Sequence, residues 1–123
     1  MWINGEWVSG SSGRMVEVLN PYTEEVIGTV PAGTAVEVER AVQAAQASFA
    51  VWRWLPGVQR AEYLHEVARK LREKEMALAR QLTLEGGKPL IENRDEVGWT
   101  AACFDYYAEI GRHSRGRVIP SIE

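Results

Sequence analysis

The first part of the chain alternates apolar and polar residues, whereas the remainder repeats its apolar residues at helical spacing. Residues 2–8 alternate around Asn4-Gly5, a pair that favours a type I′ hairpin turn. Residues 15–19 predict a strand, residues 20–25 a turn, and residues 26–30 a further strand. The N-terminal segment is therefore predicted to form one small antiparallel sheet of about three or four short strands.

The hydrophobic period changes to that of a helix from Thr34 onward. Thr34, followed three residues later by Glu37, matches a capping box. The apolar residues that follow recur at spacings of three, four and seven, which places them on one helical face. This face consists of Val38, Ala41, Val42, Ala45 and Phe49.

Three further helices are predicted by the same period and by glycine and proline at their ends. The second spans about residues 58–73 after Pro56-Gly57, and the third ends at Gly86. The fourth starts at Pro89 and ends near Gly111 or Gly116. The predicted inner faces are Ala61, Leu64, Val67, Ala68 and Leu71 in the second helix, and Val97, Ala101, Phe104 and Ala108 in the fourth. The apolar residues that indicate the third helix are Ala77, Leu78, Leu82 and Leu84.

Strands followed by helices predict an α+β fragment, with β-hairpins over residues 1–31 and helices over residues 34–116. The predicted sheet is too small to cover several long amphipathic faces. These faces need a broad partner surface, so we expect the chain to form one part of a larger folded body. Self-association of a free-standing interaction module is the alternative.

Composition excludes several classes of function. Fourteen basic residues stand against 17 acidic ones, for a net charge of −3, and the two signs are interspersed, which argues against a nucleic-acid partner such as DNA. No apolar run approaches the ~20 residues that span a bilayer, and Met1 leads directly into the first hairpin without the pattern of a signal peptide. The single cysteine, Cys103, suits a reducing compartment. We therefore expect a cytoplasmic protein that does not contact membranes.

Several short motifs occur together in a fixed order. They are Ile3-Asn4-Gly5-Glu6-Trp7, Asn20-Pro21 through Val30-Pro31, the segment from Val38 to Ala45 with Phe49 and Trp52, Leu84-Glu85-Gly86-Gly87-Lys88-Pro89, Tyr106-Tyr107-Ala108, and Gly116-Arg117-Val118-Ile119-Pro120. In these motifs the chain resembles the N-terminal portion of the NAD(P)-dependent aldehyde dehydrogenases. The family more often carries asparagine or threonine where Gly86 stands.

The resemblance implies that residues 1–123 belong to a cofactor-binding domain and pack around a Rossmann-type sheet that later sequence supplies. A β arm for oligomerisation would follow Pro120, so the implied partners are the remainder of the chain and a homo-oligomer. The full enzyme would use NAD or NADP to oxidise an aldehyde to a carboxylic acid through a cysteine thioester. The family's residues for catalysis, cofactor binding and cofactor choice lie beyond Glu123. We therefore assign no catalytic or cofactor-binding residue, and expect neither cofactor binding nor aldehyde oxidation by this chain alone.

One ligand hypothesis rests on the same resemblance. An acid at the position of Glu96 helps some family members to bind a structural monovalent cation, together with backbone carbonyls that here belong to Val18 and Leu19. Aspartate is more usual than glutamate at this position, and a solvated carboxylate on a helix surface is the alternative.

Other candidate residues favour structural roles. Cys103 lies mid-helix beside apolar positions and does not match the family's nucleophile motif, so we interpret it as a structural thiol. His65 and His113 lack metal-ligand spacing and are interpreted as surface histidines. Gly86-Gly87-Lys88 is read as a helix C-cap rather than a phosphate-binding turn, because the P-loop frame is absent. Trp52, Trp54 and Trp99 are expected in the core or in an interface.

Overall fold

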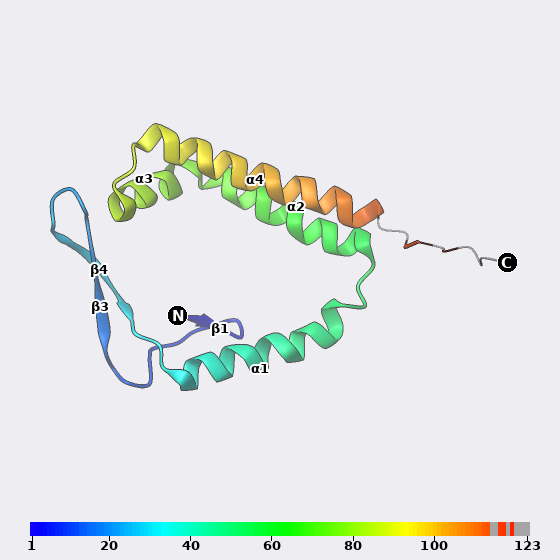
Figure 1. Cartoon of the computed structure of the whole chain (residues 1–123), viewed down its shortest axis with the longest axis horizontal. Coiled ribbons are helices and arrows are strands. Elements are labelled where there is room, and N and C mark those ends of the chain that lie inside the picture. Colours follow the sequence, from blue (N-terminus) through cyan, green and yellow to red (C-terminus); the bar gives the residue numbers. More distant parts are fainter. Residues whose placement is uncertain (114–115, 118, 120–123) are drawn as a thin grey trace.

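The computed structural model describes residues 1–113, 116, 117 and 119 of the chain (Figure 1). The strands are β1 (Trp2–Ile3), β2 (Glu6–Trp7), β3 (Met15–Leu19) and β4 (Val26–Pro31). The helices are α1 (Ala35–Trp52), α2 (Gly57–Glu73), α3 (Glu75–Gly86) and α4 (Leu90–His113). The predicted order of hairpins followed by helices is confirmed. Residues 114 and 115 of the predicted helical region, and 118 and 120 of the exit motif, lie outside the described residues.

The strands form two separate antiparallel hairpins, so the prediction of one small sheet was wrong. In the first hairpin, β1 pairs with β2 across Asn4-Gly5, and both turn residues have the positive φ that a type I′ turn requires (54° and 81°). In the second, β3 pairs with β4 from Met15 opposite Pro31 to Leu19 opposite Val26, with a register shift between Val18 and Leu19.

The connection between the hairpins explains why they stay apart. The Ser11 N–H donates to the Glu37 carboxylate at 2.9 Å, which fixes this connection at the start of α1. Gly10 lies so close to the carbonyl oxygen of Ala32 that a Cβ at this position would collide with it. These contacts hold the connection against the start of α1 and the end of the second hairpin, and β2 and β3 belong to different ladders.

Helix α1 begins with the predicted capping box. Thr34 Oγ1 accepts from the Val36 N–H at 3.2 Å, and the Thr34 N–H donates to Glu37 at 2.8 Å. The predicted apolar face exists, but the described part of the chain leaves it open to solvent. The exposed fractions are 63% for Val38, 56% for Val42 and 58% for Phe49.

Helices α2 and α4 pack along each other and form the best-buried part of the molecule (Figure 1). Small side chains allow the helices to approach, since a Cβ on Gly57 would lie 2.5 Å from the carbonyl oxygen of Gly111. The predicted inner faces are confirmed for their small residues, whereas Leu64, Leu71 and Phe104 are only half-buried and Val67 is more exposed. The buried residues of this seam are Ala61, Ala68, Val97, Ala101 and Ala108.

Helix α3 follows α2 after the single residue Lys74 and ends at Gly86, as predicted. The next residue, Gly87, is the C-cap, and its φ of 72° is the left-handed conformation that this position favours. Its main contacts are with α4 rather than with α2. The third helix is confirmed, and its buried position is Ala79. Of the apolar residues that predicted this helix, Leu78 is half-buried, and Ala77 and Leu82 are exposed.

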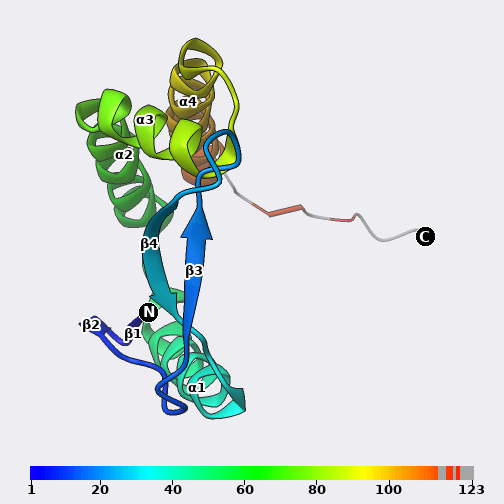
Figure 2. The ribbon, with the colours of Figure 1, turned by 90° about the vertical axis from the view of Figure 1, so that its left-hand side faces the viewer.

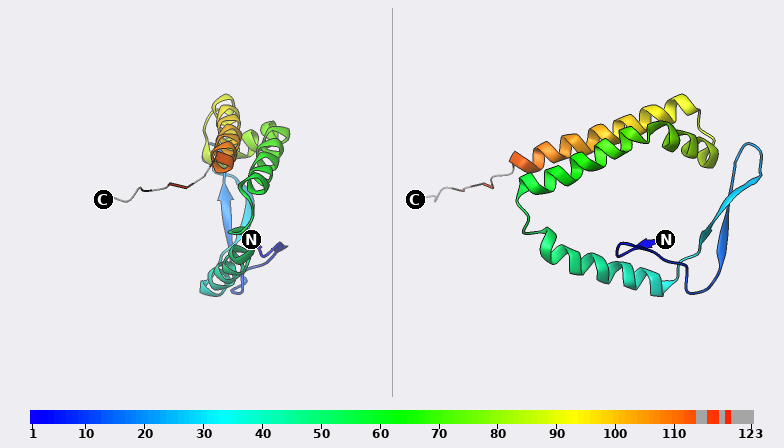
Figure 3. Two further views of the ribbon diagram at one scale, coloured as in Figure 1. Left: turned by 90° about the vertical axis from the view of Figure 1, so that its right-hand side faces the viewer. Right: turned by 180° about the vertical axis from the view of Figure 1, so that it is seen from behind.

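The elements form an open frame rather than layers around one core. Helix α1 lies apart from the α2–α4 pair, and the β3–β4 hairpin runs between them at one end (Figure 2). The view from behind shows the same separation, with residues 53–56 joining α1 to α2 at the other end (Figure 3). In the described part of the chain, no large side chain is fully buried.

Within residues 1–113, no helix is both long enough and apolar enough to cross a bilayer.

Candidate functional site

The proposed cation ligand Glu96 lies on α4 beside a cation supplied by the chain itself. Its Oε1 accepts from the Lys88 ammonium at 2.5 Å, and Glu92 Oε2 lies 3.6 Å from the same nitrogen. The hydrogen bond to Glu96 is the main reason why the pKa of Lys88 is raised. Val18 and Leu19 lie at the register shift near the end of β3. The monovalent cation site stays a prediction, and Lys88 is the group with which a cation would compete.

The Gly86-Gly87-Lys88 turn is a helix C-cap, as predicted. The Gly87 N–H donates to the Thr83 carbonyl at 2.9 Å and closes α3. The Lys88 ammonium contacts two carboxylates, those of Glu92 and Glu96.

Cys103 and the tryptophans are exposed in this chain. Cys103 lies on α4 outside the α2–α4 seam, so its thiol is not part of the packed core. Trp54 and Trp99 are 77% and 68% exposed, and Trp52 is 39% exposed. Of the two predicted environments for these tryptophans, the core is excluded for Trp54 and Trp99 within this chain, and an interface stays a prediction.

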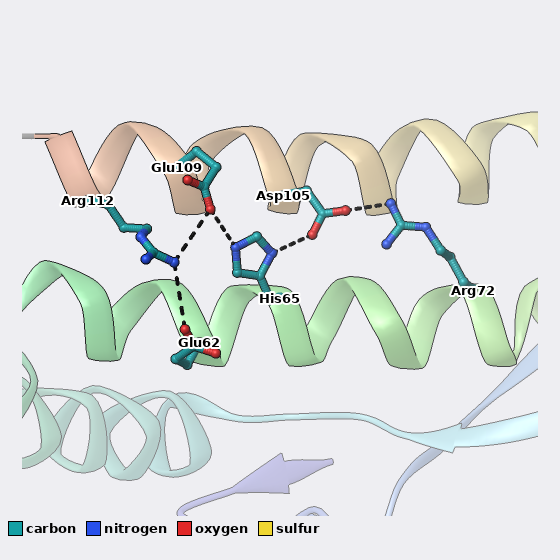
Figure 4. A network of polar contacts seen from close by, with 6 residues as sticks. All are labelled: Glu62, His65, Arg72, Asp105, Glu109 and Arg112. Carbon is teal, nitrogen blue, oxygen red and sulfur yellow. Dashed lines mark hydrogen bonds and ion pairs between the residues drawn. The ribbon is translucent and has the colours of Figure 1, made fainter.

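A polar network across α2 and α4 was missed from the sequence (Figure 4). His65 projects from α2 between two carboxylates of α4. Its Nδ1 lies 2.7 Å from Asp105 Oδ1, and its Nε2 lies 2.9 Å from Glu109 Oε1. Asp105 and Glu109 are four residues apart, which places them on one helical face. That spacing was the available signal, but only the packing of α2 on α4 brings His65 to it.

Two arginines extend the network. Arg72 Nη2 donates to Asp105 Oδ2 at 2.5 Å, and Arg112 Nη1 lies 3.8 Å from both Glu62 and Glu109. Hydrogen bonds from His65 and then from Arg72 lower the pKa of Asp105, and hydrogen bonds to Asp105 and then to Glu109 raise the pKa of His65. Oppositely charged partners favour the charged form of each group.

This network does not form a metal centre. The two carboxylates contact opposite nitrogens of one imidazole ring, so the three groups do not converge on a common point (Figure 4). Within residues 1–113, no group of three or more histidine, cysteine, aspartate and glutamate side chains is arranged to hold a metal ion. The network can join two helices and exchange a proton, because both ring nitrogens of His65 contact carboxylates.

An open hollow of about 530 Å³ lies where α1 meets the start of α2. The Trp52 and Tyr63 rings form one part of it, with centroids 5.5 Å apart. No charged side chain contributes to the lining, so the hollow suits contact with another apolar surface. The lining residues are Ala45, Ser48, Phe49, Val51, Trp52, Leu55 and Tyr63.

Comparison with known sequences identifies relatives over nearly the whole chain. A model of the aldehyde dehydrogenase family matches residues 7–123. The chain is 42% identical over 122 residues to betaine aldehyde dehydrogenase 1 from Oryza sativa subsp. japonica. That match covers 95% of this chain and 24% of the rice protein.

Solved structures give the same result. A point mutant of betaine aldehyde dehydrogenase from Staphylococcus aureus, crystallised with NAD⁺, is 34% identical with a TM-score of 0.92, and the match covers 98% of this chain and 25% of that chain. An NADP-dependent enzyme from E. coli is 36% identical with a TM-score of 0.94 over the same shares. The chain thus spans about a quarter of the length of these relatives. Sequence and fold agree that the chain belongs to the aldehyde dehydrogenase family.

Proposed function

We propose that residues 1–123 are the N-terminal structural part of the cofactor-binding domain of an NAD(P)-dependent aldehyde dehydrogenase. In this proposal α1, α2 and α4 support a nucleotide-binding sheet formed by other parts of the enzyme, and the hairpins cover its periphery. The whole enzyme would oxidise an aldehyde to a carboxylic acid through a cysteine thioester and hydride transfer to NAD or NADP.

The observation that carries this proposal is the surface that the chain leaves open. The structure exposes 9836 Å², whereas a compact monomer of 13.8 kDa exposes roughly 6,600 Å². The excess is roughly 3,200 Å², and a standard interface covers only about 800 Å² on each partner. An enclosing body of several elements accounts for this area better than one flat contact does.

The positions of the exposed apolar residues agree with such a body. One face of α1, the hollow between α1 and α2, and the β3–β4 hairpin all carry exposed apolar side chains. On the hairpin these include Val16, Leu19, Val26 and Val30, each close to half exposed. A two-stranded ribbon with apolar side chains is stable only when other elements cover it.

A segment exchange tests the proposal. Residues 1–123 replace the matching segment of the rice relative, and aldehyde-dependent reduction of NAD⁺ is measured on the purified chimera. We expect activity in the chimera and none in the isolated chain, because the chain supplies scaffold and not chemistry. Activity of the isolated chain with any aldehyde would overturn the proposal, as would a folded chimera without activity.

Variants of α1 in the chimera test which face is covered. Val42→Asp places a charge on the apolar face and is expected to abolish soluble, active enzyme. Gln43→Asp is the control, since Gln43 hydrogen-bonds to Glu39 on α1 outside that face. Equal activity in the two variants would show that this face packs against nothing.

The alternative function is a self-associating interaction module. The exposed apolar area also favours this reading, because large uncovered patches promote association. Sedimentation of the isolated chain separates the alternatives. A defined, concentration-independent oligomer would support the module, whereas open-ended association would indicate a surface that evolved to contact other parts of a longer chain.

Location, cofactor and assembly complete the proposal. We place the enzyme in the cytoplasm, which a single unpaired cysteine suits. We expect NAD or NADP to bind to other parts of the enzyme, and the enzyme to assemble as a homo-oligomer. A structural monovalent cation at Glu96, with carbonyl ligands from Val18 and Leu19, is retained here as a proposal.

A further inference from the structure

The His65 bridge has a requirement that follows from hydrogen-bond chemistry alone. Both ring nitrogens lie within hydrogen-bond distance of carboxylate oxygens, 2.7 Å to Asp105 and 2.9 Å to Glu109. A neutral imidazole has one N–H and one lone pair, whereas an imidazolium has two N–H groups. Carboxylates only accept, so both contacts are attractive only when His65 is doubly protonated.

The charged groups around His65 differ between its Nδ1 side, which contacts Asp105, and its Nε2 side, which contacts Glu109. They come from α4, through Asp105, Glu109 and Arg112, and from α2 itself, through Glu62 and Arg72. Asp105 has a second close cation, since Arg72 donates to it at 2.5 Å. Besides His65, Glu109 has Arg112 at 3.8 Å as its one cationic neighbour among the described residues, and Arg112 is equally close to Glu62. The Glu109 side therefore depends more strongly on the proton of His65.

We propose that His65, Asp105 and Glu109 form a proton-dependent clamp between α2 and α4, which opens on the Glu109 side when the Nε2 proton leaves. The remaining Nδ1–H stays on Asp105, which Arg72 holds in place. The Nε2 lone pair then faces the Glu109 carboxylate and repels it. Glu109 turns toward Arg112, and the last turns of α4 lose one link to α2.

The position of the clamp determines which part of the α2–α4 pair responds when it opens. Glu109 precedes Gly111, whose carbonyl lies against Gly57 at the start of α2. Opening loosens this end of the helix pair, while the Ala61, Ala68 and Ala101 seam keeps the rest together. The bridging groups are about one-third to one-half exposed, so solvent and salt moderate the effect.

Histidine NMR on the full 123-residue chain tests the clamp. The chain has two histidines, so loss of one signal in His65→Gln assigns the other to His113. We expect His65 to titrate above its ordinary value of 6.5. Backbone amides of residues 106–113 should shift with the same midpoint, because the end of α4 responds to the proton.

Variants separate the clamp from a passive ion pair. Glu109→Gln should lower the His65 midpoint and remove the linked amide shifts, since the glutamine amide can donate to the neutral Nε2. Glu66→Gln is the control, because Glu66 pairs with Arg69 and Lys70 away from the bridge. Where Glu109→Gln disturbs folding, Glu109→Asp replaces it and should lower the midpoint by a smaller amount. An unchanged midpoint in the Glu109 variant that folds, or α4 amides that ignore the titration, would overturn the proposal.

Discussion

Glu37 shows how a single residue connects the hairpins to the helices. The carboxylate is 3% exposed and accepts from Thr34 Oγ1 at 2.6 Å, from the Thr34 N–H at 2.8 Å and from the Ser11 N–H at 2.9 Å. The Thr34 hydroxyl, and then the Thr34 N–H, lower the pKa of Glu37 from 4.5 to about 2. Glu37 therefore stays charged at acidities where most carboxylates are neutral.

Acid unfolding measures this contribution. A carboxylate whose pKa is lower in the folded state stabilises the fold above its unfolded pKa. That stability is lost as the pH falls from 4.5 through about 2. Glu37→Gln should flatten the dependence of helix content on pH in this window, as followed by circular dichroism. Glu39→Gln, on the exposed surface of α1, should leave the curve unchanged, and an equal effect of both variants would contradict the assignment.

At the scale of elements, the approach of α2 to α4 depends on glycine at one position. A Cβ on Gly57 would lie 2.5 Å from the Gly111 carbonyl oxygen, which is backbone and cannot rotate away. Gly57→Ala should therefore destabilise the chain by about 1–3 kcal/mol, the usual cost of overpacking. Urea unfolding of the purified chain measures this change.

Gly98→Ala, in the same helix pair, is expected to have the opposite effect on stability. A Cβ at Gly98 would meet only Glu75 Oε1, at an ordinary 3.9 Å. Alanine in a helix interior is more favourable than glycine by about 0.5–1 kcal/mol, so this variant should be more stable than the parent chain. Destabilisation by Gly98→Ala, or a neutral Gly57→Ala, would show that the helices adjust their separation.

The elements themselves were predictable because local chemistry fixes them. The Thr34–Glu37 capping box, the Asn4-Gly5 turn and the Gly87 C-cap each depend on neighbouring residues, and each formed as predicted. Pairing between distant elements was not predictable in the same way. The separation of the hairpins depends on contacts of Gly10 and Ser11 with residues far along the chain.

The same distinction between local and long-range contacts applies to the site residues. The C-cap role of Gly87 follows from local sequence, whereas the partners of His65 lie 40 and 44 residues away on another helix. Spacing alone placed Asp105 and Glu109 on one face, but not opposite a histidine. The sequence likewise predicted an apolar face on α1, and the described part of the chain leaves this face exposed.

At the scale of the whole molecule, the small core predicts a shallow unfolding transition. The m-value of denaturant unfolding rises with the surface exposed on unfolding. The folded chain already exposes 9836 Å². Unfolding would therefore newly expose roughly three-quarters of the area that the unfolding of a compact domain of equal mass newly exposes. We expect a urea m-value lower by about the same factor, with binding of a hydrophobic dye before unfolding.

When the chain is joined to the rest of an enzyme, the low m-value and the binding of a hydrophobic dye should both disappear. In the chimera with the rice relative, the open faces of α1 and of the β3–β4 hairpin become buried, so dye binding should disappear. Amide exchange in α1 should slow at the same time, because its backbone then opens only with the larger body. The comparison needs the isolated chain at low concentration, where self-association does not mask the exposed faces. A full-sized m-value and no dye binding in the isolated chain would show that it closes its own apolar surface, which is incompatible with a scaffold role.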